Sequence, residues 1–349
     1  MTSIQSILVT GGAGYVGSIL TNELVKKNYK VIAVSSAMSG VTNDLIKKSK
    51  ILSSPNHSNK NWITDQYDQS VMCDTIQKSG GDSAVIRIHN KEKAIAISVD
   101  SSALYCKADP KIGGKQIVAE NWRNLISVGA KPLAITNCLN FGSPEKPKVM
   151  GEFVECVEGI KEACEFLNFP VVSGNVSFYN ETNSKSIFPT PVIGGVGVID
   201  NLKNVINIKT KKNGNLIIAI GKTLGHIEQS AFLHENFSIY DGPPPEVNLI
   251  NEKNNGLAVL KLIKDNLVLS AHDISSGGML VALAEMSISS GLGLKINKPK
   301  KSANTMEYFF GEDQGRYIVE IEKQNLEKFC LLYTSPSPRD ATLSRMPAC

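Results

Sequence analysis

FPVVSGNVSFYNE, residues 169–181, joins an apolar run to a dense group of polar side chains. The apolar run predicts a buried strand over Phe169–Ser173, and rigid strand ends are where α/β and α+β folds place ligand chemistry. Gly174 lets the backbone approach a phosphate closely, whereas Asn175 and Ser177 offer oxygen ligands or hydrogen bonds. The segment therefore predicts a binding site at a strand end, with a simple polar turn as the alternative.

Strands and helices alternate on the N-terminal side of this segment. Apolar residues with a period of two predict strands, and those with a period near 3.6 predict helices. On this basis strands are expected at residues 84–88, 94–99 and 132–136, the first two as a hairpin, and helices at 115–128 and 149–167. This alternation predicts a mixed α+β and α/β architecture in which helices cover a sheet.

Polar groups follow three of these strands. Asp100 follows the second strand of the hairpin, Asn137 and Asn140 lie in an expected tight turn, and Gly174 ends the third strand. If the strands are neighbours, these groups converge along one edge of the sheet. Such an edge suits a magnesium–nucleotide site, because Mg²⁺ prefers hard oxygen ligands and bridges phosphates. Ordinary turn formation is the alternative for the two asparagines.

A second block of strands and helices begins near Gly214. Strands are expected at 216–221 and 267–273, the latter ending in His272 and Asp273, and a helix at 279–290. The turn Ser275-Ser276-Gly277-Gly278 precedes that helix. Free N–H groups and the helix dipole make such a turn an anion cradle, and capping by Ser275 or Ser276 is the alternative.

Composition narrows the function classes. The chain is 42% hydrophobic without an apolar run of about 20 residues, which predicts no membrane span. The net charge of +4, without a basic cluster interleaved with aromatics, argues against a nucleic-acid partner. Seven cysteines without a CxxC pair, and no secretory signal, predict a cytoplasmic chain with reduced thiols. The five histidines lack metal-ligand spacing.

Residues 1–34 are expected to form a separate βαβ unit. Gly12, Gly14 and Gly17 give the spacing GxGxxG between a strand and a helix, which is a dinucleotide-phosphate fingerprint. The unit resembles the start of extended short-chain dehydrogenases and sugar-nucleotide epimerases, which implies NAD, but the acidic residue expected after the second strand is absent. Residues 35–48 resemble a segment of aspartate kinases. The polar stretch 49–61 completes a snippet and linker over 35–61.

Residues 331–349 are expected to be a disordered tail. Their three prolines disfavour a helix or a central strand, and the stretch resembles translated adaptor sequence. A natural flexible terminus is the alternative. The chain is therefore expected to be composite, with one continuous body at 62–330.

That body resembles the phosphoribosylformylglycinamidine synthase (PurL) family of the small bacterial type, in the PurM-like, AIR synthase superfamily. The strings that carry the resemblance follow the order of the family's second half: ITDQYDQSV, SVDSSALY, GGKQIVAENWRNLISVGAKPLAITNCLNFGSPEKP, VVSGNVSFYNET, PTPVIGGVGVID, SAHDISSGGMLVALAE and FGEDQGRY. The resemblance implies an AIR synthase N-terminal-like domain over 62–205, which pairs with another copy or half. A C-terminal-like α/β domain over 206–330 would follow.

The family resemblance implies an ATP- and Mg²⁺-dependent carbon–nitrogen ligase of purine biosynthesis. Its substrate would be formylglycinamide ribonucleotide, and its ammonia would come from a PurQ-like glutaminase assembled with a small PurS-like subunit. By resemblance, Asn137 and Gly174 contact ATP, Asn175 ligates magnesium and Ser177 contacts the substrate. Some members hold aspartate at the position of Asn137, so any metal contact there lacks its charge.

The same resemblance implies no catalytic residue in this chain. The family's catalytic histidine belongs to a first half that does not precede Trp62, and His272 does not match it. A structural or nucleotide-adjacent role is implied for His272, and Glu312-Asp313-Gln314 is not assigned the substrate-binding role of a similar loop in the first half. The chain alone is therefore expected to be inactive. The alternatives are an NAD-dependent epimerase or dehydratase, and a non-catalytic ATP- or ADP-binding module.

Overall fold

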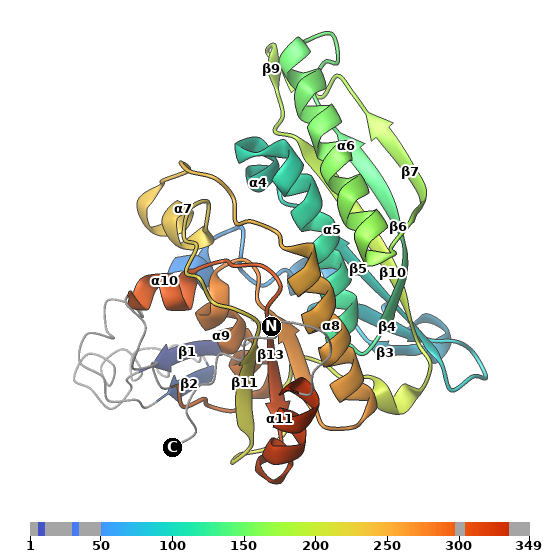
Figure 1. Ribbon diagram of the computed structural model, residues 1–349, viewed down its shortest axis with the longest axis vertical. Helices are drawn as coiled ribbons and strands as arrows, with labels where there is room; N and C mark the ends of the chain where they lie inside the picture. The colour runs from blue at the N-terminus through green and yellow to red at the C-terminus, as the bar shows by residue number, and fades with distance from the viewer. Residues whose placement is uncertain (1–5, 11–29, 35–49, 297–303, 335–349) are drawn as a thin grey trace.

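A computed structural model describes residues 6–10, 30–34, 50–296 and 304–334. Figure 1 shows two lobes, one built on a six-stranded sheet with long helices beside it and one built on a three-stranded sheet. Each sheet lies against helices, as expected for a mixed α/β architecture. Buried apolar residues of both lobes belong to one large core cluster, which includes Ile135 and Phe169 from the first lobe and Val319 from the second.

The six-stranded sheet has the order β3-β4-β5-β10-β6-β7. Its strands are β3 (Thr75–Gln77), β4 (Ala84–Arg87), β5 (Ala94–Asp100), β10 (Thr190–Ile199), β6 (Lys131–Asn140) and β7 (Val171–Ser177). All neighbours are antiparallel except β6 and β7, which are parallel. The expected hairpin of β4 and β5 is confirmed. β7 lies at an edge of the sheet.

Two strands extend further than expected, and this corrects the sequence interpretation. β6 continues through Asn140 and β7 through Ser177, so the polar residues expected in turns or at strand ends lie within strands. Asparagine and glycine are depleted in strands, which explains why the sequence interpretation ended both strands too early. The pairing of β6 with β7 also shifts register once. The partner of Ile135 is Val171 and the partner of Thr136 is Ser173, so Val172 is an extra, bulged residue.

Helices α4 (Ala103–Ala108), α5 (Pro110–Ser127) and α6 (Pro147–Leu167) cover one face of this sheet. α5 begins before the expected residue 115, because Asp109 caps it by accepting a hydrogen bond from Ile112 N at 2.9 Å. Gly113 and Gly114 lie inside the helix. A Cβ on Gly114 would come within 2.3 Å of the Cys156 carbonyl oxygen, so this glycine lets α5 and α6 pack closely.

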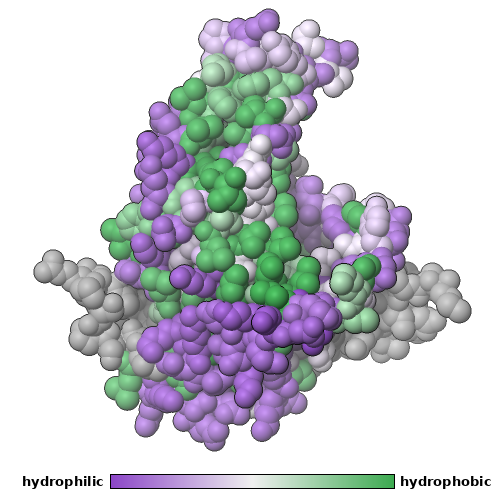
Figure 2. Space-filling model, turned by 90° about the vertical axis from the view of Figure 1, so that its right-hand side faces the viewer, coloured by the Kyte–Doolittle hydropathy of each residue, from purple (hydrophilic) through white to green (hydrophobic). Residues whose placement is uncertain are grey.

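The opposite face of the sheet carries exposed apolar side chains. Val99 is 66% exposed, and Ile86, Ile97 and Val196 are also exposed although they lie on regular strands. The register places these residues on the face turned away from α5. Figure 2 shows apolar residues gathered over the upper lobe, whereas the lower lobe is hydrophilic in the same view.

The second lobe has the strand order β11-β13-β12, all antiparallel. Its strands are β11 (Leu216–Ile220), β13 (Tyr317–Ile321) and β12 (Ser270–Asp273), and its helices are α7 (Ala231–Phe237), α8 (Leu249–Lys264), α9 (Gly278–Ser290), α10 (Thr305–Phe310) and α11 (Leu326–Thr334). The expected strands and the helix at 279–290 are confirmed. Short elements complete the first lobe: α3 (Asn61–Thr64), β8 (Glu181–Thr182) and β9 (Lys185–Ser186).

The chain ends differ in part from expectation. β1 (Ser6–Thr10) and β2 (Lys30–Val34) form the expected parallel pair, whereas Gly12, Gly14 and Gly17 lie outside the described residues. Ile51, in the expected linker, is fully buried in a cluster with Phe232 and Phe310 of the second lobe. α11 continues through Thr334, four residues into the expected tail.

Among the described residues, no helix is both long enough and apolar enough to cross a membrane.

Candidate functional site

One row of paired residues crosses the six-stranded sheet and contains three of the predicted polar positions. Asp100 pairs with Ile193, Ile193 pairs with Asn137, and Asn137 pairs with Gly174. Paired residues project to the same face, and adjacent strands lie about 4.8 Å apart. Asp100, Asn137 and Gly174 therefore share one face of the sheet, but Asp100 lies three strands away from Gly174, so only Asn137 and Gly174 are direct neighbours. All three lie on the face covered by the helices, because Ile193 is fully buried and Asp100 contacts α5.

Gly174 provides the space in which the Asn137 side chain lies. A Cβ at residue 174 would come within 1.9 Å of Asn137 Oδ1, a distance that no real side chain tolerates. The glycine was expected to admit a phosphate. On the helix-facing side its missing side chain instead admits the Asn137 amide.

Asn175 and Ser177 face the other side of the sheet. Asn175 pairs with Cys138 and Ser177 pairs with Asn140, so both alternate with the row that contains Gly174. Asn140 in turn donates a hydrogen bond from Nδ2 to the Thr190 carbonyl oxygen at 3.1 Å. The structure therefore brings the four predicted site residues onto two adjoining strands but separates them into two pairs on opposite faces.

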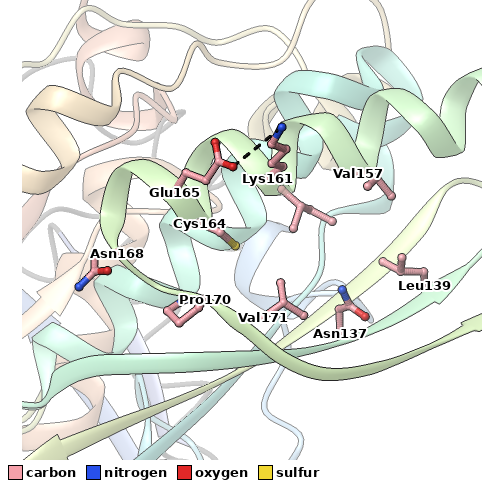
Figure 3. Close-up of a pocket in the computed structure, with 10 residues that line it drawn as sticks. Asn137, Leu139, Val157, Lys161, Cys164, Glu165, Asn168, Pro170 and Val171 are labelled. Atoms are coloured by element: carbon pink, nitrogen blue, oxygen red, sulfur yellow. Dashed lines mark ion pairs between the residues drawn. The ribbon is translucent and has the colours of Figure 1, made fainter.

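A cavity of about 390 Å³ lies between α6 and the β6–β7 edge. Figure 3 shows Asn137, Leu139 and Val171 along the strands, facing the helix residues that line the other side. Lys161 and Glu165 form an ion pair of 3.9 Å on the helix. The cavity is mainly apolar with a few polar groups, as small-molecule sites are. Its volume lies at the lower end of the range for such sites.

The loop after β7 is held by its own side chains. The Glu181 carboxylate accepts hydrogen bonds from Lys146 Nζ at 2.7 Å, from the Ser186 hydroxyl at 2.7 Å and from Ser143 N at 3.0 Å. Lys146, followed by Ser186 and Ser143 N, lowers the pKa of Glu181 to about 2. Glu181, the carboxylate of the quoted segment, is thus a structural anion that fixes the loop.

A group of carboxyls lies between the lobes. The sequence interpretation named Asp100 and Asp273 but not Asp82 and Glu120, and it did not bring the four together. The group comprises Asp82, which precedes β4, Asp100 on β5, Glu120 on α5 and Asp273 on β12. Burial, reinforced by neighbouring carboxylates, raises the pKa values of Asp100, Glu120 and Asp273 to about 7. Asn121 and Asn124 donate hydrogen bonds to Asp100 at 2.7 and 2.8 Å.

Arg123 brings a buried positive charge to this group. It is fully buried on α5 and bonds Glu252 at 2.7 Å, Asp273 at 3.4 Å and Gln314 at 3.0 Å. Burial opposes its charge, but the surrounding carboxylates raise the pKa of Arg123 above its usual value. A charged residue in the middle of a buried helix face was the sequence signal for this network, because buried charges require partners.

Three side chains of this region offer ligand atoms within 4.8 Å of one another: Asp82, His272 and Asp273. His272 Nδ1 lies 2.6 Å from Asp82 Oδ1 and Nε2 lies 3.1 Å from Glu285 Oε2. Burial works against protonation of His272, but Asp82 and Glu285 raise its pKa well above the usual value. Asp82 Oδ2 is buried without a hydrogen-bond partner. A buried carboxylate oxygen without a hydrogen-bond partner is suited to bind a divalent cation.

The turn before α9 already contains an anion supplied by the chain. Gly277 N donates to Glu312 Oε1 at 2.7 Å, Ala231 N at the start of α7 donates to the same oxygen at 2.8 Å, and Tyr105 donates to Oε2. Gly277 is the N-cap residue of α9 and no side chain caps this helix. The alternative prediction, that Ser275 or Ser276 caps it, is therefore wrong. The Glu312 carboxylate therefore occupies the predicted cradle.

Comparisons with known proteins agree with this architecture. A family model described as AIR synthase related protein, N-terminal domain, matches residues 80–199, and the corresponding C-terminal domain matches residues 212–334. A model of the NAD dependent epimerase/dehydratase family matches residues 7–103. The chain belongs to the AIR synthase related family.

Within that family the resemblance is to PurL. Phosphoribosylformylglycinamidine synthase subunit PurL of Pelagibacter ubique (strain HTCC1062) is 55% identical over 302 residues, which are 86% of this chain and 40% of the relative. This match is longer than the segment 62–330, so it extends beyond the expected body. The expected PurL resemblance is therefore confirmed, and the chain spans about 40% of the length of that curated relative.

Solved structures show the same fold. T. maritima PurL complexed with ATP has a TM-score of 0.55 and 25% identity, covering 82% of this chain and 39% of that chain. The structure of PurLQS from Thermotoga maritima has a TM-score of 0.56 and 28% identity, covering 76% of this chain and 38% of that chain.

Proposed function

We propose that this chain supplies the nucleotide-binding part of a PurL-type synthetase in purine biosynthesis. The observation that carries the proposal is the row from Asp100 to Gly174, which lies within a fold and a sequence 55% identical to a PurL subunit. The reaction is an ATP-dependent carbon–nitrogen ligation. ATP transfers its γ-phosphoryl group to the amide oxygen of formylglycinamide ribonucleotide, and ammonia then displaces phosphate to give the amidine.

The side chains are suited to distinct tasks in that reaction. Asn137 and Gly174 contact ATP on the helix-facing side of the sheet. Asn175, on the other face, offers an amide oxygen to Mg²⁺, and the Ser177 hydroxyl contacts the ribonucleotide. Magnesium, when bound, neutralises charge on the phosphates, while these amides and hydroxyls orient the reactants. The two pairs lie on opposite faces of the sheet but β7 is an edge strand, so ATP and Mg²⁺ in this proposal meet around its free edge.

Partners follow from the same proposal. Ammonia reaches the chain from a PurQ-like glutaminase, with a small PurS-like subunit in the assembly, and the T. maritima structure described as PurLQS supports this arrangement. The setting is cytoplasmic. The 349-residue chain alone binds ligands without turning them over, because the catalytic histidine is carried by a different half of family members.

A second candidate is a nucleotide-binding module without turnover. Asp82, His272 and Asp273 favour it, because their ligand atoms lie within 4.8 Å of one another and provide a cation position distinct from Asn175. Burial raises the pKa of Asp273 to about 7, and an additional Mg²⁺ would replace the proton that this carboxyl holds below that pH. In this candidate the ion and a nucleotide stabilise the folded chain.

The proposal is tested by calorimetric titration of the purified chain with ATP at saturating Mg²⁺. We expect binding in which Asn175→Ala reduces the magnesium dependence and Ser177→Ala weakens only the ribonucleotide. Asn254→Ala, at an exposed position of helix α8, is the matched control. Failure of the chain to bind ATP would contradict the proposed nucleotide-binding role. Conversion of formylglycinamide ribonucleotide by the chain with ATP, Mg²⁺ and ammonia would contradict the proposed lack of turnover. Binding of NAD instead would favour the epimerase or dehydratase alternative, which the model matching residues 7–103 supports.

A further inference from the structure

Tyr179 has an unusual backbone conformation. Its φ is 60°, in the left-handed region, and its side chain is 62% exposed. Asn168 and Asn183 share this region, but asparagine tolerates it because its short side chain bonds locally. A bulky aromatic residue has no such compensation, and glycine would adopt the conformation freely.

The surrounding loop enforces this conformation. Tyr179 N donates to the Gly142 carbonyl oxygen at 3.0 Å, and Asn180 Nδ2 donates to the Ser177 carbonyl oxygen at 2.8 Å and to that of Phe141 at 3.0 Å. The preceding Phe178 packs edge-on against Phe153 with ring centroids 5.1 Å apart. The backbone is therefore fixed by contacts that do not require a tyrosine ring at residue 179.

The Tyr179 hydroxyl points to one surface carboxylate. It donates to Glu145 Oε1 at 3.2 Å, and Glu145 is exposed in the loop that precedes α6. The phenol is a donor at neutral pH, as tyrosine ordinarily is, and the charge of Glu145 raises the pKa of Tyr179 further. A phenol and a carboxylate thus stand together at the surface, two residues after Ser177.

This pair has the chemistry of sugar recognition. A carboxylate accepts hydrogen bonds from adjacent hydroxyls, as acidic residues do with the ribose of dinucleotides, and a phenol both donates and accepts. The aromatic ring adds an apolar wall beside the polar groups. The positively charged neighbour Lys146 is already bound to Glu181 at 2.7 Å and does not neutralise Glu145.

We propose that Glu145 and Tyr179 bind the vicinal hydroxyls of a ribose, so that they select ribonucleotides over deoxyribonucleotides. The inference rests on the proposed function, in which both ATP and formylglycinamide ribonucleotide carry a ribose. The inference adds Glu145 and Tyr179 to the site at Ser177, together with a preference for ribose over deoxyribose. In this inference the ring and hydroxyl of Tyr179 serve the ligand, which offsets the backbone strain.

The test compares each ribose ligand with its 2′-deoxy counterpart by titration of the full chain. The original chain is expected to bind the ribose form about tenfold more tightly, a typical loss for one hydrogen bond to a charged group. Glu145→Gln and Tyr179→Gly should abolish this preference, whereas Glu158→Gln, an exposed α6 control, should retain it. The ligand whose preference is lost, ATP or formylglycinamide ribonucleotide, identifies the source of the ribose.

Stability separates this role from a structural one. Tyr179→Gly should unfold at the same or higher denaturant concentration while it loses the preference, because glycine relieves the left-handed strain. Loss of stability with an unchanged ribose preference would overturn the inference, as would an unchanged preference in Glu145→Gln. If Ser177→Ala leaves ribonucleotide affinity unchanged while Glu145→Gln abolishes the preference, the substrate assignment fails and the ribose site stands. Binding of neither ligand would overturn both.

Discussion

At the level of single residues, the buried carboxyls determine how this chain responds to charge. Arg123 has no exposed surface and is shared between Glu252, Asp273 and Gln314, so its removal leaves two buried carboxyls without their cation. Breaking a buried ion pair costs far more than breaking a surface pair, because a charge is left uncompensated. Arg123 therefore links the two lobes through electrostatics as well as packing.

Arg123→Met is expected to lower the free energy of unfolding by about 3–5 kcal/mol. The methionine fills most of the volume, so the loss reports the unpaired carboxylates. Lys161→Met is the matched control, because its 3.9 Å pair with Glu165 is exposed and should be worth less than about 1 kcal/mol. Both values are measured by urea unfolding monitored by circular dichroism, and equal losses would contradict the explanation.

The same carboxyls predict a pH dependence. The pKa values of Asp100, Glu120, Asp273 and Glu312 are raised to about 7, while unfolded carboxyls titrate near 4. The folded chain thus binds more protons between these values, so stability should decrease as pH rises from about 4 to 7. Thermal unfolding across this range checks the sign. Glu120→Gln should flatten the profile, and a melting temperature that rises steadily with pH would contradict it.

At the level of elements, the β6–β7 edge shows what the sequence could predict. The alternation of strands and helices, the hairpin of β4 and β5, and the neighbouring polar residues Asn137 and Gly174 follow from local patterns. The ends of β6 and β7 do not, because asparagine and glycine resemble turn residues until strand pairing overrides their preference. The face on which each residue lies depends on register, which a single sequence does not reveal. The partners of Arg123, distant in sequence, are equally hidden.

Gly174→Ala should destabilise the chain by about 1–3 kcal/mol, because the added methyl group overlaps Asn137 Oδ1. ATP affinity should also fall as the amide is displaced. Gly151→Ala is the control: nothing lies within 4 Å of the place its Cβ would take, and Gly151 is an exposed residue inside helix α6. That substitution should stabilise the helix by roughly 0.5–1 kcal/mol. Denaturant unfolding and ATP titration of both variants test the contrast.

At the level of the whole molecule, the two faces of the six-stranded sheet differ in what covers them. α5 and α6 bury one face, while Ile86, Ile97, Val99 and Val196 remain exposed on the other. Contiguous exposed apolar surface marks an interaction site or an aggregation risk. Pairing of this domain with another copy or half, as the family resemblance implies, would cover the face.

The apolar face predicts self-association of the purified chain. Val99→Asp should reduce the weight-average mass in sedimentation at micromolar concentration, with the free energy of unfolding changed by less than about 0.5 kcal/mol. Leu257→Asp changes an apolar residue on α8 that is 49% exposed and should leave association unchanged. A monomeric original chain, or equal effects of both substitutions, would contradict the role of this face.

The extra residue at Val172 has a consequence for how this edge strand tolerates a change in length. Loss of Val172 would make the pairing regular and leave Ser173 opposite Thr136, so every later residue of β7 would keep its face. Loss of Val176, beyond the bulge, would instead bring Ser177 opposite Leu139 and turn its hydroxyl under α6. Deletion of the Val172 codon would thus keep the residues on the two faces of β7 apart, whereas deletion of the Val176 codon would move Ser177 from one face to the other.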